Sequence, residues 1–549
     1  MKLIELQIQN FRGLSGESNI ISFDNTDLIF LIGNNNNGKS TFLHAYNFFT
    51  NPKTKPTIED FHNKSDDTPI IIVAKYKQEN KVDEPNWVSD WADTNGIITI
   101  KKEWHTIGVE GKKYTYNPKL QSFAPGGFGG FDSLLTTYSP KAIFINAINS
   151  IEDLEKEIND IISKNHIKKL KDDYKEQHDS IVDALNDLKN KITSSEDICI
   201  LQENINTQFK KIFPKLDLNI YSKAEEGIDI TKTLKSTHGF EIKDGLNNID
   251  INQNGHGVLR QALFSFLSSK EAKDGNYIIL FEEPELYLHP KTIAVLKDEL
   301  YKLSSNENCQ VLCATHSPSM IDLSKPHSSL VRLVKHPKTN ITSTHQVNLD
   351  IFKDEEKDQL QMINRFNPHI CEAFYSDEII LVEGDTEAII YRELINNHFK
   401  NKNREVFILN TGSKSNMVFY QKILTHFAIK HTVVHDSDSK FTDKKKENSS
   451  EFKINPMWSV NQKIWEQIEK TNSIIPNLSK RFVHFNNFEE EHSYKYDKIL
   501  GKPLSAYNFA KNINSIDNSE YSCIIFLKDL FGENKINITP EELLNNVKP

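Results

Sequence analysis

The sequence lacks the cysteine density of small secreted domains and the excess of positive charge of proteins that coat nucleic acids. Its 549 residues include five cysteines, and only Cys309 and Cys313 lie near each other, in or beside an expected strand. This spacing predicts neither a disulfide framework nor a zinc ribbon, and it favours a reducing compartment. A formal net charge of −10 excludes a small basic DNA-coating protein. It does not exclude nucleic acid binding, because a local basic groove or bound metal ions can offset phosphate charge.

Long hydrophobic runs and a leader segment are also missing. Apolar runs such as Tyr277–Phe281 are too short to cross a bilayer, and Met1–Glu5 mix charge with apolar residues. The composition, 38% hydrophobic and 26% charged, is typical of globular proteins. At about 150 residues per domain, the length allows about three or four structural units. We therefore expect a globular, cytoplasmic protein with no membrane partner.

A glycine-rich segment follows the apolar run Leu28–Ile32 and precedes a helical pattern. Residues 33–40 read GNNNNGKS, which matches G-x-x-x-x-G-K-[ST]. In this setting the loop points backbone N–H groups at phosphate oxygens, and the helix N-terminus faces the anion. Lys39 would contact the β- and γ-phosphates, and Ser40 would bind Mg²⁺. The residues expected to bind ATP here are Gly33, Asn34, Asn37, Gly38, Lys39, Ser40 and Thr41.

Two later strands end in residues that suit the same nucleotide. The run Ile278–Phe281 leads to Glu282, which would hold the Mg²⁺ shell where aspartate is common, and to Glu283, which would polarise the attacking water. The order of these motifs resembles ATP-binding-cassette ATPases, and the resemblance makes His316 a sensor of the γ-phosphate. Residues 255–260, GHGVLR, weakly resemble the signature loop of that family, with Leu259 where a polar residue is frequent.

A second group of acidic residues lies in the C-terminal half. Glu383 ends an apolar strand and Glu387 begins the next helix, while Asp436 and Asp438 follow another apolar strand about fifty residues later. Because alternate strand residues share a face, both aspartates are expected to point at one spot. Such carboxylates repel one another unless cations neutralise them, and oxygen ligands suit Mg²⁺ or Mn²⁺. The pattern predicts a two-metal site for phosphodiester cleavage.

Further charged residues fit that metal site. Glu489 and Glu490 lie in an acidic run and are expected to add ligands for a second metal ion. Lys502, which we prefer to Lys498, would place a cation at the transition-state phosphate. The lysines between residues 440 and 446 follow the aspartates directly, where they can contact a DNA backbone.

Together these motifs resemble the OLD (overcoming lysogenisation defect) family of nucleases, from Leu3 to about Pro503. The segments that carry the resemblance are residues 33–41, 281–290, 314–318, 381–387 and 436–438, and residues 412–415, GSKS, resemble the family's glycine–lysine turn. The resemblance implies ATP and Mg²⁺ or Mn²⁺ as cofactors, metal-dependent cutting or nicking of DNA, and dimerisation through the ATPase. The Gabija nuclease subunit and retron-associated OLD effectors share this layout, which implies a role in phage defence.

The resemblance and the hydrophobic patterns predict an α/β fold, an ABC/SMC-type ATPase followed by a C-terminal Toprim domain. A helical, coiled-coil-like insertion is expected to be either an amphipathic helix pair packed on its own domain or a dimerisation arm. The predicted segments are the first ATPase part at 1–150, the insertion at 151–200, the second ATPase part at 201–365, the Toprim domain at 366–510 and a helical tail at 511–549.

The leading functional hypothesis is an ATP-regulated DNA endonuclease or nickase whose catalytic residues are Glu283, Glu383, Asp436, Asp438 and Lys502. We expect a homodimer or higher homo-oligomer, with a helicase or a retron reverse transcriptase and its nucleic acid as defence partner. The alternative is a RecF/SMC-like DNA-binding repair ATPase with an inactive Toprim domain. A topoisomerase would need a nucleophilic tyrosine in a separate DNA-breaking domain, and no segment predicts one. The sequence leaves open whether ATP activates or restrains cleavage.

Overall fold

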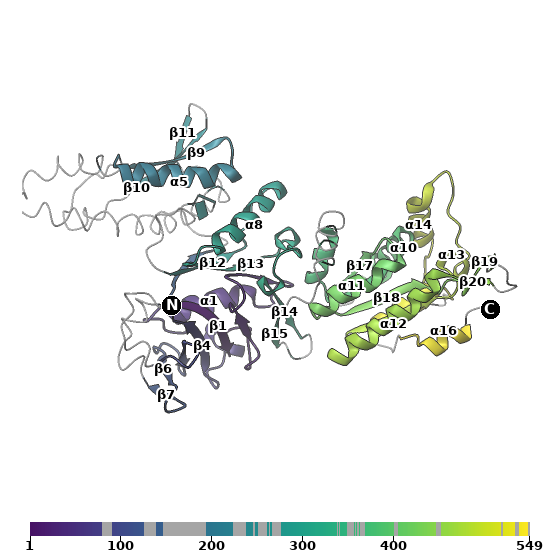
Figure 1. The fold of residues 1–549 in the computed structure, drawn as a ribbon, viewed down its shortest axis with the longest axis horizontal. Helices are drawn as coiled ribbons and strands as arrows, with labels where there is room; N and C mark the ends of the chain where they lie inside the picture. The colour runs from purple at the N-terminus through teal and green to yellow at the C-terminus, as the bar shows by residue number, and fades with distance from the viewer. Residues whose placement is uncertain are drawn as a thin grey trace, which may run out of the picture. The chain divides into compact units, whose positions relative to one another are not determined.

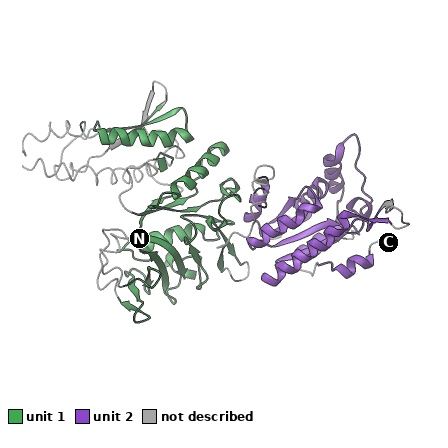
Figure 2. Cartoon of the chain, in the orientation of Figure 1, with its two compact units in different colours: residues 1–350 green, residues 351–549 purple. Residues whose placement is uncertain are grey.

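A computed structural model shows two compact units, residues 1–350 and 351–549 (Figures 1 and 2). The described ranges are 1–78, 91–125, 139–146, 194–222, 238–244, 247–250, 276–336, 341–347, 368–399, 404–445, 452–517, 520–532 and 537–546, with single residues between some of them. None of the described helices is long and apolar enough to cross a lipid bilayer.

The first unit begins with a six-stranded antiparallel sheet. Its strands alternate between buried and partly exposed residues, as a sheet with one covered face requires. In spatial order β2-β1-β4-β5-β6-β7, the strands span Ile20–Ser22, Lys2–Gln9, Ile70–Lys77, Ile97–Trp104, Lys112–Asn117 and Ser122–Pro125.

A second six-stranded sheet carries the glycine-rich loop. All its neighbouring strands are parallel except the pair β14–β15. In spatial order β15-β14-β3-β13-β12-β8, they span Thr342–Gln346, Leu330–Lys335, Leu28–Ile32, Cys309–Ala314, Tyr277–Glu282 and Lys141–Ile145. Every residue of β3 and β13 is buried, which explains their continuous apolar sequences.

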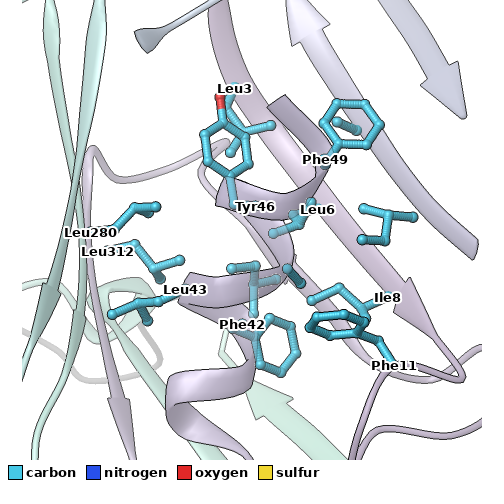
Figure 3. Packing of buried hydrophobic residues seen from close by; sticks show 14 of the residues in the cluster. Leu3, Leu6, Ile8, Phe11, Phe42, Leu43, Tyr46, Phe49, Leu280 and Leu312 are labelled. Atoms are coloured by element: carbon cyan, nitrogen blue, oxygen red, sulfur yellow. The ribbon is translucent and has the colours of Figure 1, made fainter. Parts of the chain in front are cut away.

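Helix α1 (Lys39–Thr50) joins the two sheets into one core. Its apolar residues Phe42, Leu43 and Tyr46 pack in one buried cluster with Leu6 of β1 and Leu280 of β12 (Figure 3). Helix α8 (Pro290–Ser304) packs against β3 and β13. The first residue of α1 is the expected phosphate-binding lysine, so the core packing of this helix positions that lysine directly.

A helix and a small sheet form the rest of the described first unit. Helix α5 (Glu196–Ile212) packs on β9 (Leu216–Ser222), which pairs with β10 (His238–Asp244), which pairs with β11 (Asn247–Asp250). The predicted end of the helical insertion at residue 200 falls inside α5, because Leu201, Ile205 and Phe209 continue its buried face. Residues 151–190 of the insertion and most of 255–260 lie outside the described residues.

The second unit is built on a four-stranded parallel sheet in the order β17-β16-β18-β21. The strands span Val406–Asn410, Glu378–Val382, His431–Asp436 and Ser479–His484. A two-stranded hairpin is formed by β19 (Phe441–Lys445) and β20 (Phe452–Ile454). The helices are α10 (Asp385–Leu394), α11 (Lys414–His426), α12 (Pro456–Ile474), α13 (Phe488–Glu491), α14 (Gly501–Lys511), α15 (Ser522–Gly532) and α16 (Pro540–Asn546).

Short helical turns complete the two units. They are η1 (Ile58–Asp60), η2 (His62–Lys64), η6 (Pro318–Met320), η7 (His327–Ser329), η8 (Pro368–Tyr375) and the π-helical η9 (Ile395–Phe399).

The segment expected as a helical tail, 511–549, contributes to the core of the second unit. Residues Ile524, Phe526 and Leu527 of α15 are buried in one cluster with Ile390 and Tyr391 of α10. The division between the units falls at residue 350, whereas the predicted boundary at 365 lies in a stretch where only single residues are described.

Candidate nucleotide site and carboxylate site

The loop between β3 and α1 is closed by its own lysine. Lys39 Nζ donates hydrogen bonds to the carbonyl oxygens of Gly33 at 2.7 Å and Asn34 at 2.9 Å. Burial lowers the pKa of Lys39 to about 8, against the opposing charges of Glu283 and Glu285. A phosphate group that took the place of the two carbonyls would restore a full negative partner to this ammonium group.

The backbone of this loop depends on its two glycines. Gly33 has a φ of +136°, and a Cβ there would lie 2.4 Å from the carbonyl oxygen of Leu333 on β14. Asn37 Nδ2 donates to the same carbonyl at 2.9 Å. Gly38 caps α1 with a φ of +88°. The Asn37 side chain therefore contacts β14 and holds the loop in place, and it does not point toward the expected phosphate position.

Acidic residues and a histidine follow the neighbouring strands β12 and β13. The backbone N–H of Glu283 donates to the carbonyl of Ala314 at 2.8 Å, and 3.5 Å separates Glu283 Oε1 from His316 Nε2. Burial, then the charge of Lys39, lowers the pKa of His316 to about 4, so its ring is neutral at pH 7. Glu282 opposes that shift. The structure thus brings Lys39, Glu282, Glu283 and His316 into one electrostatic group.

Glu285 belongs to this group, and the sequence analysis gave it no role. Its Oε1 accepts hydrogen bonds from the Thr315 hydroxyl and from the His316 backbone N–H, both at 2.7 Å. These bonds tie the loop after β12 to the loop after β13 and so orient His316. The sequence signal for Glu285 was its place as the third glutamate of the run E-E-P-E. A glutamate that accepts a hydrogen bond from a distant backbone N–H cannot be told from a surface glutamate by sequence.

The carboxylates of the second unit meet at the carboxyl ends of adjacent parallel strands. Glu383 follows β16, and its Oε1 accepts from the backbone N–H of Asp436 at the end of β18, at 2.8 Å. Asp436 Oδ1 accepts from the backbone N–H of Phe488 at 2.9 Å. Glu387 Oε2 accepts from the backbone N–H of Gly384 at 2.8 Å and thereby caps α10. The edge of a parallel sheet at its carboxyl ends is a common ligand site.

Burial, followed by repulsion between carboxylates, raises the pKa values in this cluster. Burial, then the charges of Glu387 and Glu383, raises the pKa of Asp436 to about 9. Burial, then Glu383, raises the pKa of Glu387 to about 8. The pKa of Glu383 is raised by burial and held back by Lys414. Buried oxygen donors that must take up protons at neutral pH fit a divalent cation such as Mg²⁺ or Mn²⁺, which would replace those protons.

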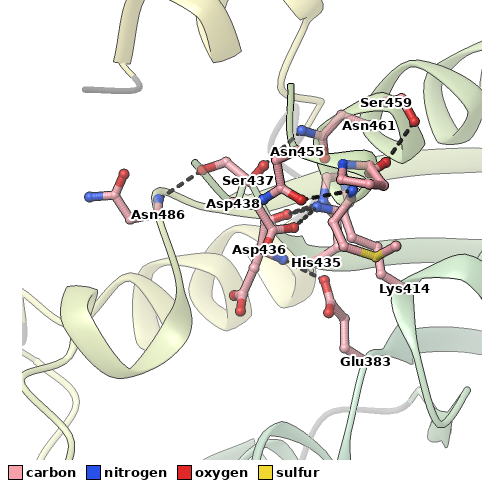
Figure 4. Close-up of polar contacts among 12 residues, drawn as sticks. Glu383, Lys414, His435, Asp436, Ser437, Asp438, Asn455, Ser459, Asn461 and Asn486 are labelled. Carbon is pink, nitrogen blue, oxygen red and sulfur yellow. Dashed lines mark hydrogen bonds and ion pairs between the residues drawn. The ribbon is translucent and has the colours of Figure 1, made fainter. Parts of the chain in front are cut away.

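Asp438 does not lie on the strand with Asp436, as the alternation argument had assumed. Strand β18 ends at Asp436, and Asp438 adopts a φ of +58° in the following loop. Its Oδ2 accepts from Lys414 Nζ at 2.5 Å, and the same ammonium group lies 2.5 Å from the carbonyl oxygen of Asp436 (Figure 4). The two aspartates are therefore joined through Lys414.

Lys414 is the lysine that the structure brings to the carboxylates. It is the first residue of α11 and its side chain is only 2% exposed. The sequence analysis noted the turn GSKS around it but chose Lys502 as the cation. Lys502 Nζ lies 5.6 Å from the centre of the Tyr496 ring. The signal that could have separated the two lysines was the resemblance of residues 412–415 to the family's glycine–lysine turn.

The acidic run after β21 contributes unequally. The charge of Glu489 raises the pKa of Glu383, Glu387 and Asp436, so its carboxylate belongs to the cluster. Both glutamates are exposed, but Glu490 is not among the charges that raise these pKa values. Of the two glutamates proposed as further metal ligands, the electrostatics thus favour Glu489.

A buried hydrogen-bond network holds α13 behind the cluster. The donor atoms of His484, Glu491 and His492 lie within 4.8 Å of one another. Hydrogen bonds account for this proximity: His484 Nδ1 bonds Glu491 Oε2 at 2.5 Å, and Ser522 Oγ bonds both Glu491 Oε2 at 2.7 Å and His492 Nε2 at 3.1 Å. Because α13 supplies both the Phe488 N–H and Glu489, this network positions two groups of the carboxylate site.

Comparisons with known proteins match both units. Residues 1–124 and 109–321 match the family described as AAA ATPase domain. Residues 374–438 match the family described as Overcoming lysogenization defect protein-like, TOPRIM domain. That second match contains Glu383, Glu387, Lys414, Asp436 and Asp438 and ends before Glu489.

Two relatives are similar over most of the chain. The Old nuclease of Escherichia phage P2 is 24% identical over 80% of this chain and 77% of its own length. Endonuclease GajA of Bacillus cereus strain VD045 is 24% identical over 95% of this chain and 90% of its own length. A solved Smc head domain from Pyrococcus furiosus, bound to the C-terminal domain of ScpA, aligns with a TM-score of 0.44 and 12% identity, over 66% of this chain and 99% of that one.

The raised pKa values predict how stability depends on pH. In the unfolded chain both carboxyl groups have the ordinary pKa of about 4, whereas in the fold the pKa is about 8 for Glu387 and about 9 for Asp436. At pH values between these limits, the metal-free folded protein therefore binds more protons than the unfolded chain. Its unfolding free energy should therefore fall as pH rises through this window. In calorimetry with a chelator, we expect the Tm to fall from pH 5 to pH 9, and Mg²⁺ to raise the Tm most at the alkaline end. A Glu387→Gln/Asp436→Asn variant should show a flatter pH profile, and an unchanged profile would contradict the assignment.

Proposed function

We propose that the chain is an ATP-binding, divalent-metal-dependent DNA endonuclease or nickase. It is a member of the OLD family of nucleases, with an AAA ATPase domain followed by an OLD-like TOPRIM domain. The observation that carries the proposal is the convergence of Glu383, Glu387 and Asp436 beside the ammonium group of Lys414, with pKa values raised by burial and by neighbouring carboxylates.

The carboxylate site has the parts that phosphodiester cleavage needs. Glu383, Glu387, Asp436, Asp438 and Glu489 would hold Mg²⁺ or Mn²⁺. Such ions supply an activated water and stabilise the leaving oxygen. The backbone N–H groups of Gly384, Asp436 and Phe488 keep one oxygen of Glu387, Glu383 and Asp436 in place and leave the other for a ligand.

Lys414 is the proposed cation for the phosphate. Its Nζ has two anchors, the Asp436 carbonyl and the Asp438 carboxylate, and retains further N–H donor capacity. An ammonium group held in this way can donate to a non-bridging phosphate oxygen as charge builds up on it.

The nucleotide site supports ATP binding by the first unit. Lys39 would exchange the carbonyls of Gly33 and Asn34 for the β- and γ-phosphates, with Ser40 and Glu282 at the Mg²⁺ ion. Glu283 would orient the attacking water. Because His316 is neutral and its backbone is held by Glu285, its ring can accept or donate a hydrogen bond at the γ-phosphate.

We further propose that the protein acts in the cytoplasm in phage defence, as a homodimer or higher homo-oligomer. Resemblance to defence nucleases supports this setting. The alternative, a DNA-binding repair ATPase with an inactive Toprim domain, predicts ATP-dependent DNA binding without cleavage, and the complete carboxylate set argues against it.

Plasmid cleavage tests the nuclease proposal. We expect purified protein to nick or cut plasmid DNA with Mg²⁺ or Mn²⁺ and to be inactive with a chelator. Asp436→Ala removes a metal-binding oxygen and should slow cleavage about 10²–10³-fold while the fold is retained, as monitored by circular dichroism. No cutting under any metal, nucleotide or partner condition, or equal cutting by the variant, would refute the proposal.

A matched pair of lysine variants tests the choice of cation. Lys414→Met keeps the length of the side chain and removes its charge, so we expect cleavage to slow about 100-fold with little change in DNA affinity. Lys502→Met should cleave within about twofold of wild type. The opposite ranking in single-turnover rates would return the role to Lys502.

Variants of the nucleotide site test whether ATP controls cleavage. Glu283→Gln should retain ATP binding and slow ATP hydrolysis about 100-fold, and Lys39→Ala should weaken ATP binding. We expect both variants to lose the difference in plasmid cleavage that wild type shows with and without ATP. If wild type and Lys39→Ala cleave identically under both conditions, the two sites are not coupled.

A further inference from the structure

The hairpin β19–β20 exposes an apolar face. Phe441 lies directly opposite Ile454 in the strand register, and Phe452 is two residues from Ile454 on the same strand. All three therefore share one face. Their side chains are 43%, 46% and 57% exposed for Phe441, Phe452 and Ile454. A cluster of large apolar side chains that remains in water on a two-stranded hairpin marks a contact surface.

The hairpin is anchored next to the carboxylate site. Strand β19 starts in the loop that carries Asp438, and the backbone N–H of Asn455 donates to the carbonyl of Lys440 at 3.0 Å, which closes the base of the hairpin. Helix α12 follows at once, and Asn461 Nδ2 on it donates to the carbonyl of Ser437 at 2.8 Å (Figure 4). The base of the hairpin and the loop that carries Asp438 are thus fixed to one another.

The charge of the hairpin identifies the partner class. Residues 440–454 contain five lysines and three acids, a net charge of +2 in a chain of net charge −10. Lys440 Nζ lies 5.6 Å from the centre of the Phe441 ring. Lys440 and Lys453 are both exposed. Lys453 lies between Phe452 and Ile454 in β20, so its side chain leaves from the opposite face of the hairpin. An exposed apolar face with one ammonium group beside a ring and another on the far face suits nucleic acid, since bases stack on the rings while the lysines contact phosphates.

We propose that the hairpin β19–β20 is the element with which this nuclease engages unpaired bases beside the cut site. Phe441 and Phe452 stack on bases, and Ile454 extends the apolar face. Lys440 contacts the phosphate beside Phe441, and Lys453 contacts the phosphate backbone from the opposite face of the hairpin. The substrate class is therefore DNA with single-stranded or frayed character near the scissile bond. This inference rests on the proposed nuclease function, which the carboxylate site carries.

Binding to three labelled DNAs of one sequence tests the hairpin: a single strand, a duplex with a single-stranded arm and a blunt duplex. Fluorescence anisotropy is measured with full-length protein in Ca²⁺, an oxygen-ligated ion like Mg²⁺ that neutralises the carboxylates. The variants are Phe441→Leu/Phe452→Leu, Phe441→Tyr/Phe452→Tyr and Lys440→Gln/Lys453→Gln. The control is Ile474→Ser, an exposed apolar residue at the end of α12.

We expect the leucine variant to bind the single strand and the armed duplex about tenfold more weakly, and the blunt duplex within about threefold of wild type, because leucine keeps the apolar surface and loses stacking. The tyrosine variant and the control should match wild type. The glutamine variant should weaken all three complexes alike and reduce the salt dependence by about two phosphate contacts.

Unchanged binding by the leucine variant, with the Tm of wild type, overturns the proposal. So does a Phe441→Ser/Phe452→Ser variant that changes the oligomeric state in sedimentation without changing DNA affinity, which would assign the face to contacts between copies of the chain. Failure of the nuclease proposal is distinguishable: a wild type that binds unpaired DNA through the hairpin but never cleaves refutes the nuclease and leaves the hairpin assignment intact.

Discussion

Repulsion among buried carboxylates is the interaction on which the second unit's site depends. Glu383, Glu387 and Asp436 lose hydration together and face one another's charge, so their pKa values rise. The fold tolerates this because backbone N–H groups donate to all three and Lys414 adds a buried positive charge. A divalent ion would replace the protons that Glu387 and Asp436 take up at neutral pH.

Each site gives its charged groups an internal partner that a ligand would displace. In the first unit the carbonyls of Gly33 and Asn34 accept hydrogen bonds from Lys39, whose pKa is lowered by burial against the charges of Glu283 and Glu285. In the second unit protons and Lys414 take the place of metal ions. Ligand binding at each site would replace a weak internal partner by a stronger one. The ligand should therefore raise the unfolding free energy of the unit that binds it.

Sequence reasoning located the elements well where strand and helix patterns were continuous. The apolar run Leu28–Ile32 is strand β3 without change, and the run Ile278–Phe281 lies within β12, which is one residue longer at each end. The start of α10 was expected at Glu387, two residues late, because the capping contact between Glu387 and the Gly384 N–H carries no hydrophobic signal. It also treated Asp438 as part of a strand, whereas the chain turns after Asp436 with a positive φ at Asp438.

The sequence by itself determined which residue types follow the ends of the strands: the phosphate loop at Gly33–Ser40, the acids after β12 and the acids after β16 and β18. Short-range chemistry is sufficient there, because a glycine-rich turn or an acid after a buried strand has few structural uses. Only the tertiary structure decided which distant groups meet these residues. Lys414 contacts the aspartates, Glu489 lies with the other carboxylates, and Glu285 holds His316. The packing of α11, of α13 and of the loop after β12 sets these distances, and the separation of the residues in the sequence does not.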